Sequence, residues 1–233
     1  MFNKSKNHKL RMNFNSLAVH KLKTPLSSIK LCLEMLLNGD FGELNEEQKE
    51  AISKIYHRND NLIYLVNDLL NIEKGGGNHY DMATVDAEQI MKSVIESEQE
   101  EIEKKRIKIN FAKSQILHEV KVDKDKIFLA LQNIVDNAVK YTPVGGEVSI
   151  YLKMDGENLE CVVKDSGIGV PEKEKGKLFT EFFRGKNAEK IEPMGSGLGL
   201  FIAKKTIEDH HGKIWFESEE GKGSTFYVVL PAK

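Results

Sequence analysis

Four short segments of this 233-residue chain carry side chains that could take part in phosphoryl transfer. The first, residues 19–26 (VHKLKTPL), contains a histidine whose neutral imidazole has a free lone pair near pH 7 and could attack a phosphorus atom. The other three, at residues 133–142, 165–169 and 195–199, combine amides, a carboxylate and glycines. A nucleophile and a nucleotide pocket on one chain predict phosphoryl transfer from a nucleotide to the protein's own histidine.

Two asparagines in the second segment could serve a metal ion. Asn133 and Asn137 lie four residues apart in a predicted helix and therefore share one face. Asparagine is a poor helix former, so two on one face call for a reason. An amide oxygen is a suitable ligand for Mg²⁺, and Lys140 could add positive charge beside phosphates. The alternative interpretation is a polar stripe that faces solvent.

The third segment could read a nucleotide base. Asp165 follows the apolar strand predicted at residues 159–164 and precedes the residues Ser-Gly-Ile-Gly. A carboxylate at the end of a strand can accept a hydrogen bond from an exocyclic amine such as that of adenine. Gly167 and Gly169 would let the backbone approach a flat ring closely. The alternative is an ordinary turn, because Asp-Ser-Gly is common in turns.

The fourth segment could hold phosphates. Gly195, Gly197 and Gly199 open a predicted helix, where free N–H groups and the helix dipole favour an anion. The pattern is neither a P-loop nor the glycine fingerprint of dinucleotide-binding folds. A flexible hinge is the alternative interpretation.

The first part of the chain is predicted to form a helical hairpin. Residues from about 10 to 38 form one helix, because apolar residues recur at alternating spacings of three and four. Pro25 should bend this helix or remove one of its hydrogen bonds. Asn45 and Gln48 can form a capping box that starts a second helix, which ends at the glycines 75–77. Because two helices cannot bury such broad apolar faces alone, we expect a homodimer with a four-helix bundle.

The second part alternates between helices and strands. Helices are expected near 86–105, 123–141 and 198–210, and strands near 107–111, 118–122, 147–154, 159–164, 213–218 and 224–230. This order predicts a two-layer α/β sandwich whose sheet is covered largely on one side. Residues 166–196 have no clear period, and so long an irregular segment is usually functional or mobile, so we expect a lid.

Composition limits the classes of partner. The formal net charge of −2 gives no electrostatic reason to expect nucleic-acid binding. No stretch approaches the ~20 apolar residues of a membrane span, and no signal peptide is recognisable. Cys32 and Cys161 lie in apolar segments without metal-ligand spacing, which predicts reduced core thiols in a cytoplasmic protein. A helix that starts almost at the first residue leaves open a longer, membrane-tethered parent protein.

Taken together, the segments resemble the motifs of sensor histidine kinases. Their N, G1, F and G2 boxes resemble residues 133–142, 165–169, 179–184 and 195–200, and residues 221–226 (GKGSTF) resemble their terminal glycine motif. These kinases share the Bergerat ATP-binding fold with type II topoisomerases, mismatch-repair ATPases and heat-shock chaperones. The resemblance spans residues 10–231. It implies a dimerisation and phosphotransfer hairpin at 1–74, a linker at 75–79 and an ATP-binding domain at 80–233.

The resemblance also implies a role for each matching residue. Asn137 would hold the Mg²⁺ of ATP with support from Asn133, and Asp165 would read the adenine amine. Arg184 would reach the terminal phosphate, where a guanidinium suits the charge of the transfer state; a surface arginine is its alternative. The other implied nucleotide contacts are Lys140, Tyr141, Gly167, Gly169, Phe182, Gly195, Gly197, Leu198 and Gly199, and Phe179 and Phe183 would join Phe182 in anchoring the lid, unless these rings are ordinary core.

The acceptor histidine is expected to be His20. It falls beside the apolar stripe rather than on it, and its segment resembles the kinase H-box, usually His-Glu-Leu-Arg-Thr-Pro-Leu. The other six histidines are interpreted as surface residues. Lys21 departs from the motif, because an ammonium cannot replace the acidic residue that serves as hydrogen-bond acceptor and base. Autophosphorylation is therefore expected to be slow, and phosphatase activity, which in this family also involves the position of Thr24, to be weak.

The sequence thus predicts a protein-histidine kinase that uses ATP and Mg²⁺ and phosphorylates His20. By resemblance, the phosphoryl group would pass to an aspartate on a response-regulator receiver domain. Two alternatives remain. A Bergerat-type ATPase would need a water-activating glutamate in the helix of Asn137, where Asp136 is the nearest acidic residue. A pseudokinase that binds nucleotide and signals by dimer geometry is favoured by Lys21 alone.

Overall fold

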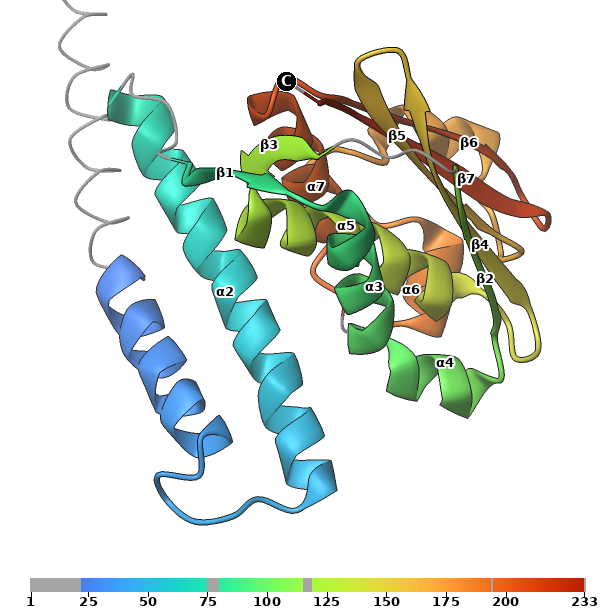
Figure 1. The fold of residues 1–233 in the computed structure, drawn as a ribbon. Helices are drawn as coiled ribbons and strands as arrows, with labels where there is room; N and C mark the ends of the chain where they lie inside the picture. Colours follow the sequence, from blue (N-terminus) through green and yellow to red (C-terminus); the bar gives the residue numbers. More distant parts are fainter. Residues whose placement is uncertain (1–21, 75–79, 115–118, 194, 233) are drawn as a thin grey trace, which may run out of the picture. The chain divides into compact units, whose positions relative to one another are not determined.

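The structure, a computed structural model, describes residues 22–74, 80–114, 119–193 and 195–232. The chain divides into two compact units, Met1–His79 and Tyr80–Lys233 (Figure 1). The first is a helical hairpin and the second mixes helices and strands. Among the described residues there is no helix with the length and apolar character needed to cross a bilayer.

The hairpin contains helical residues 22–37 and helix α2 (Glu46–Lys74). A turn at residues 38–41 separates the two, and Gly39 and Gly42 adopt positive φ angles of +81° and +112° around it. The backbone N–H of Asn45 donates to Oε1 of Gln48 (3.1 Å), and the N–H of Gln48 donates to Oδ1 of Asn45 (2.8 Å). The predicted capping box is therefore confirmed.

Polar contacts join the two helices of the hairpin. Nζ of Lys30 lies 2.5 Å from Oδ1 of Asp60, and Nδ2 of Asn59 donates to the carbonyl of Leu26 (2.9 Å). Leu33 and Val66 are buried, whereas other large apolar residues of both helices remain exposed: Leu22, Ile29, Ile55 and Leu62. Cys32 is exposed too, so its assignment to a core was wrong.

A five-stranded mixed sheet organises the second unit. The strand order is β2-β4-β5-β7-β6, in which β2 and β4 are parallel and the other neighbours are antiparallel. The strands of this sheet are β2 (Lys108–Lys113), β4 (Glu147–Asp155), β5 (Asn158–Asp165), β6 (Lys213–Glu219) and β7 (Gly223–Pro231). A second, two-stranded antiparallel sheet contains β1 (Met82–Val85) and β3 (Val120–Asp123).

Helices cover one face of the large sheet (Figure 1). These helices are α3 (Ala87–Ser97), α5 (Lys124–Tyr141) and α7 (Gly199–Asp209), and their apolar sides share one core with the sheet. Along β5 every second residue is buried, including Leu159, Cys161 and Val163. Residues of the opposite face are more exposed, and there Trp215 stacks on Tyr227 with ring centroids 5.0 Å apart. The predicted two-layer sandwich with a one-sided sheet is confirmed.

Asp123 connects the first residues of the α/β unit to helix α5 by hydrogen bonds. Its Oδ1 accepts from the backbone N–H of Lys126 (3.1 Å) and thereby caps α5, as predicted. Its Oδ2 accepts from the N–H of Asp81 (3.0 Å). The N–H of Asp123 donates to Nε2 of His210 (3.1 Å), so Nδ1 carries the proton and donates to the carbonyl of Thr206 (2.7 Å). His210 is buried, so its interpretation as a surface residue was wrong.

Three elements differ from the sequence prediction. The helix expected at 86–105 is broken at Glu98 into α3 and α4 (Gln99–Lys105). Strand β1 was not predicted. The segment expected to be irregular contains a 3₁₀ helix, η1 (Glu172–Lys177), and helix α6 (Lys186–Ile191). Both are only six residues long, too short for a periodic apolar pattern to reveal them.

Candidate functional site

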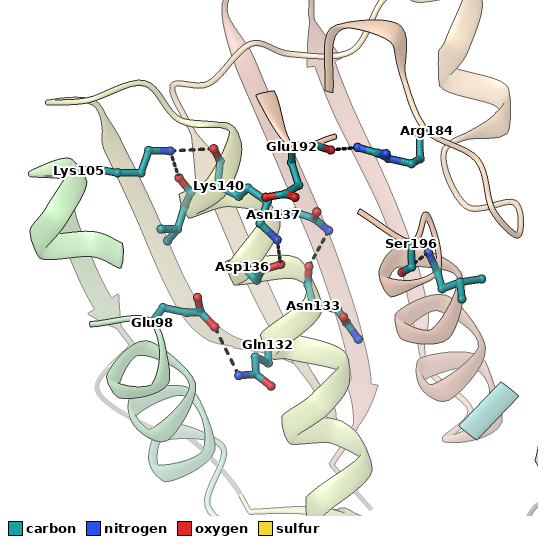
Figure 2. A network of polar contacts seen from close by, with 12 residues as sticks. Glu98, Lys105, Gln132, Asn133, Asp136, Asn137, Lys140, Arg184, Glu192 and Ser196 are labelled. Atoms are coloured by element: carbon teal, nitrogen blue, oxygen red, sulfur yellow. Dashed lines mark hydrogen bonds and ion pairs between the residues drawn. The ribbon is translucent and has the colours of Figure 1, made fainter. Parts of the chain in front are cut away.

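The two asparagines of α5 are arranged to expose an amide oxygen. Both are half-buried on one side of the helix. Nδ2 of Asn137 donates to the backbone carbonyl of Asn133 at 2.6 Å, as Figure 2 shows. Because this bond uses the NH₂ end, Oδ1 of Asn137 remains an acceptor without a partner among the described residues. An oxygen held in this way fits the preference of Mg²⁺ for hard donors.

Charged groups surround the end of α5. Nζ of Lys140 lies 2.8 Å from Oδ2 of Asp136 (Figure 2). Burial opposes the charged ammonium, but the Asp136 carboxylate outweighs burial and raises the pKa of Lys140. Nζ of Lys105 donates to the carbonyls of Val139 (2.8 Å) and Lys140 (2.7 Å), where a cation complements the negative end of the helix dipole. Lys140 is thus a charged, oriented group beside the asparagines.

A second carboxyl group lies near this cluster and was not identified from the sequence. Glu98, at the break between α3 and α4, accepts from Nε2 of Gln132 at 3.4 Å. Burial, followed by the charge of Asp136, raises the pKa of Glu98 to about 7. The sequence shows only one acid among many in residues 96–103, so no signal distinguishes it.

Asp165 is buried at the end of β5, with one oxygen occupied and one available. Its Oδ1 accepts from the backbone N–H of Gly167 (2.8 Å) and of Ser224 (3.1 Å). Its Oδ2 accepts from none of the described residues. Burial raises the pKa of Asp165, against the opposing effect of the two N–H donors. An amine donor that reached Oδ2 would therefore meet an oriented acceptor in a dry environment, where such a bond is strong.

The segment after Asp165 packs closely on two other parts of the chain. The N–H of Ile168 donates to the carbonyl of Tyr141 (3.2 Å). Gly169 has a φ angle of +62°, and a Cβ atom there would lie 2.0 Å from the carbonyl oxygen of Glu219. Only glycine fits such a position. Glycine at position 169 therefore permits a close backbone contact that a side chain would block.

The F-box residues have different environments. Phe179 packs edge-on against Phe216, with centroids 5.7 Å apart, and belongs to the core. Phe182 has a φ angle of +59° and is 67% exposed. Arg184 donates from Nη1 to the carbonyl of Pro193 (2.9 Å) and from Nη2 to that of Glu192 (Figure 2). In this structure the guanidinium therefore caps the end of α6.

The glycines before α7 bring the other segments together. A Cβ atom at Gly195 would lie 3.2 Å from the Arg184 guanidinium, one at Gly197 would lie 2.7 Å from the backbone carbon of Phe182, and one at Gly199 would lie 2.7 Å from Oδ1 of Asn133. Leu198 is buried at the start of α7, and its N–H donates to Oγ of Ser196 (3.3 Å). A side chain at Gly197 would meet backbone and push the segments apart, whereas side chains at Gly195 and Gly199 would displace the side chains of Arg184 and Asn133.

The structure thus gathers the predicted nucleotide contacts between residues 133 and 199 around the ends of α5, β5 and α6 and the start of α7. His20 and Lys21 lie outside the described residues. Thr24 is exposed in the hairpin unit, where its carbonyl accepts from Oγ of Ser28 (3.1 Å). Within the described residues, no group of three or more His, Cys, Asp or Glu side chains is placed to hold a metal ion.

Comparison with known proteins matches both units. Residues 10–78 match the family model "His Kinase A (phospho-acceptor) domain", and residues 122–233 match "Histidine kinase-, DNA gyrase B-, and HSP90-like ATPase". The chain is 35% identical to sensor histidine kinase WalK of Bacillus subtilis (strain 168) over 227 residues, which are 96% of this chain and 37% of WalK. The chain therefore spans little more than a third of that relative.

Solved structures show the same similarity. The catalytic domain of histidine kinase ThkA is 31% identical, with a TM-score of 0.58 over 65% of this chain and 96% of the domain. Full-length ShkA in complex with AMPPNP is 27% identical, with a TM-score of 0.65 over 94% of this chain and 45% of ShkA. With both family models matched in order, the chain belongs to the sensor histidine kinases of two-component systems.

Proposed function

We propose that this chain binds ATP with Mg²⁺ in its α/β unit and transfers the terminal phosphoryl group to His20. The environment of Asp165 is the observation that supports a nucleotide site most directly. Its buried carboxylate has one oxygen fixed by two backbone N–H groups and the other without a partner among the described residues. This arrangement suits the exocyclic amine of adenine. It would serve neither a carbonyl oxygen nor a phosphate, which are acceptors.

Residues of the neighbouring segments would hold the rest of the nucleotide. Oδ1 of Asn137 is an available oxygen ligand for the Mg²⁺ ion, which would neutralise phosphate charge. Lys140 would contact the phosphates from the same helix. Arg184 would have to leave the carbonyls of Glu192 and Pro193 to reach the terminal phosphate. The base, sugar and phosphates would be surrounded by the remaining predicted contacts: Tyr141, Gly167, Gly169, Phe182, Gly195, Gly197, Leu198 and Gly199.

The transfer step needs one bond formed and one broken. The lone pair of the His20 imidazole forms the N–P bond, while the bond from the terminal phosphorus to the bridging oxygen breaks and its electron pair leaves with ADP. The second ring nitrogen then loses its proton. Lys21 as an ammonium cannot accept that proton, so we infer that it passes to solvent. The phosphoryl group then moves to an aspartate carboxylate of a response-regulator receiver domain.

We further propose that the hairpin, residues 1–74, forms the homodimer and carries the acceptor, with 75–79 as linker and 80–233 as catalytic domain. Leu22, Ile29, Ile55 and Leu62 are each more than two-fifths exposed in the single chain. Exposed apolar residues on both helices are what a four-helix bundle between two copies would bury.

Labelled ATP tests the proposal directly. Incubation of the chain with Mg²⁺ and ATP labelled at the terminal phosphate should give an acid-labile, alkali-stable protein label, the signature of phosphohistidine. His20→Ala should remove the label, and His8→Ala, a second histidine near the N-terminus, should keep it. Label that survives His20→Ala would contradict the assignment. Nucleotide binding without any label would favour the pseudokinase, and release of phosphate without label would favour the ATPase.

A further inference from the structure

A serine that the proposed function does not use lies behind the Asp165 segment. Ser218, near the end of β6, is half-buried and pairs with Ser224 of β7. Its Oγ accepts from the N–H of Val170 (2.8 Å), donates to the carbonyl of Gly223 (2.9 Å) and lies 2.9 Å from Oγ of Ser224. A hydroxyl has one proton and two lone pairs. Since the Ser218 proton points to Gly223, the Ser224 hydroxyl is the donor in the third bond.

The three partners of Ser218 hold Asp165 from two sides. Val170 directly follows residues 165–169. Ser224 supplies the N–H that Oδ1 of Asp165 accepts, 3.1 Å away. Gly223 packs so closely that a Cβ atom there would lie 2.0 Å from the carbonyl oxygen of Asp165. The Ser218 hydroxyl therefore connects Val170, at the far end of the segment, to strand β7, whose Ser224 N–H binds the Asp165 carboxylate.

The turn between β6 and β7 adds a further connection. The N–H of Gly221 donates to the carbonyl of Ile168 at 2.8 Å. The backbone of Glu219 is in close contact with Gly169. Without the Ser218 hydroxyl, the N–H of Val170 and the carbonyl of Gly223 would lose the one side-chain partner that each has among the described residues. An unpaired polar group in a half-buried site favours rearrangement of the segment that carries it.

We propose that Ser218 is a positioning residue for recognition of the adenine base, acting through Val170, Gly223 and Ser224 to aim Oδ2 of Asp165 at the exocyclic amine. This inference rests on the proposed nucleotide site. It concerns selectivity as well as affinity. Inosine triphosphate has a carbonyl, a hydrogen-bond acceptor, in place of the adenine amine, so its 6-position offers no proton to a well-aimed carboxylate. Loosening Asp165 should therefore weaken ATP binding and leave binding of inosine triphosphate nearly unchanged.

The test is the ratio of the two dissociation constants, measured by titration calorimetry with Mg²⁺ on the full chain. Wild type should prefer ATP. Ser218→Ala should weaken ATP binding by about tenfold, the size of one hydrogen bond to a charged group, and that of inosine triphosphate by less than twofold. Ser218→Thr keeps the hydroxyl on a strand-compatible side chain and should restore the preference. Ser149→Ala, which removes a hydroxyl from the solvent-facing side of β4, is the matched control and should change neither constant.

Equal weakening for both nucleotides would leave the ratio of the two dissociation constants unchanged. It would show a general structural role and overturn the inference. If Ser218→Ala does not fold, Ser218→Cys, with a similar shape and a weak hydrogen-bonding group, should lower the ratio in the same direction. Wild type that binds neither nucleotide would overturn the proposed function itself. Wild type that prefers ATP, combined with a Ser218→Ala variant that prefers it equally, would overturn only the role of Ser218.

Discussion

Asn137 is oriented by the backbone of Asn133, whose carbonyl oxygen lies 2.6 Å from its Nδ2. An amide side chain has one donor end and one acceptor end, so a bond at the NH₂ group also decides where the oxygen points. In α5 the oxygen is left for a ligand, and its direction is set before any ligand binds. This prior orientation reduces the ordering cost that binding would otherwise carry.

Replacement of Asn137 by alanine should remove the Mg²⁺ dependence of ATP binding. The wild-type chain is expected to bind ATP at least about tenfold more tightly with Mg²⁺ than without it, since the metal links the amide oxygen to the phosphates. The variant should show the same, weaker affinity under both conditions. Calorimetric titrations with and without Mg²⁺ measure the difference, and Asn110→Ala on β2 is the control. A persistent Mg²⁺ effect in Asn137→Ala would assign the ion to other ligands.

Two glycines with the same backbone conformation should respond differently to alanine. Gly169 and Gly156 have φ angles of +62° and +61°, but only Gly169 has a close neighbour, the Glu219 carbonyl. Gly156→Ala should cost about 1 kcal/mol of unfolding free energy, the strain of a left-handed residue. Gly169→Ala should cost more and also weaken ATP binding at least about tenfold, because the segment after Asp165 must move. Urea unfolding measures the stability of both variants, and ATP titration measures their affinity. Equal losses of stability and affinity in the two variants would contradict the prediction.

Glu98 should make stability depend on pH in a defined direction. Burial and then Asp136 raise its pKa from 4.5 to about 7, so in this window the folded chain keeps a proton that the unfolded chain has released. Stability therefore falls as the pH rises from 4.5 to 7, by up to about 3 kcal/mol from this group. Glu98→Gln should remove that part of the slope, and Glu100→Gln, an exposed control, should not. Urea unfolding at several pH values measures it, and parallel slopes in wild type and Glu98→Gln would refute the prediction.

Lys21→Glu should speed phosphorylation of His20. Glutamate would restore a hydrogen-bond acceptor and base next to the imidazole, and general-base assistance is typically worth ~10²–10⁴-fold. We expect at least a tenfold higher initial rate of protein labelling and a higher rate of dephosphorylation of the partner regulator. Lys23→Glu controls for the change of charge. The expectation fails if Lys21→Glu leaves both rates as they are.

Local interactions were predictable from the sequence, whereas distant ones were not. The capping box of Asn45 and Gln48 and the cap at Asp123 involve partners within three residues, so residue type and spacing suffice. Strand β1 has four mostly exposed residues and no apolar alternation, and it forms only by pairing with β3. The break at Glu98 contains neither glycine nor proline, the usual signals of a helix end.

The same distinction applies to the candidate site. Gly169 and Gly197 stand out because few residue types fit a positive φ angle, and Asp165 stands out as a charged residue directly after an apolar run. Ser218 does not, because one serine in an alternating strand has no special pattern, and its role depends on Val170, 48 positions earlier in the chain. The capping of α6 by Arg184 is also hidden from the sequence, since its acceptors are backbone carbonyls that any residue would provide.

The two oxygens of Asp123 have a mechanical consequence. One holds the first turn of α5 and the other holds the backbone of Asp81, the second residue of the α/β unit. The backbone of Asp81 is therefore joined to the start of the helix that presents Asn133 and Asn137 by this carboxylate and by the adjacent pairing of β1 with β3, so a displacement of Asp81 would act on that helix.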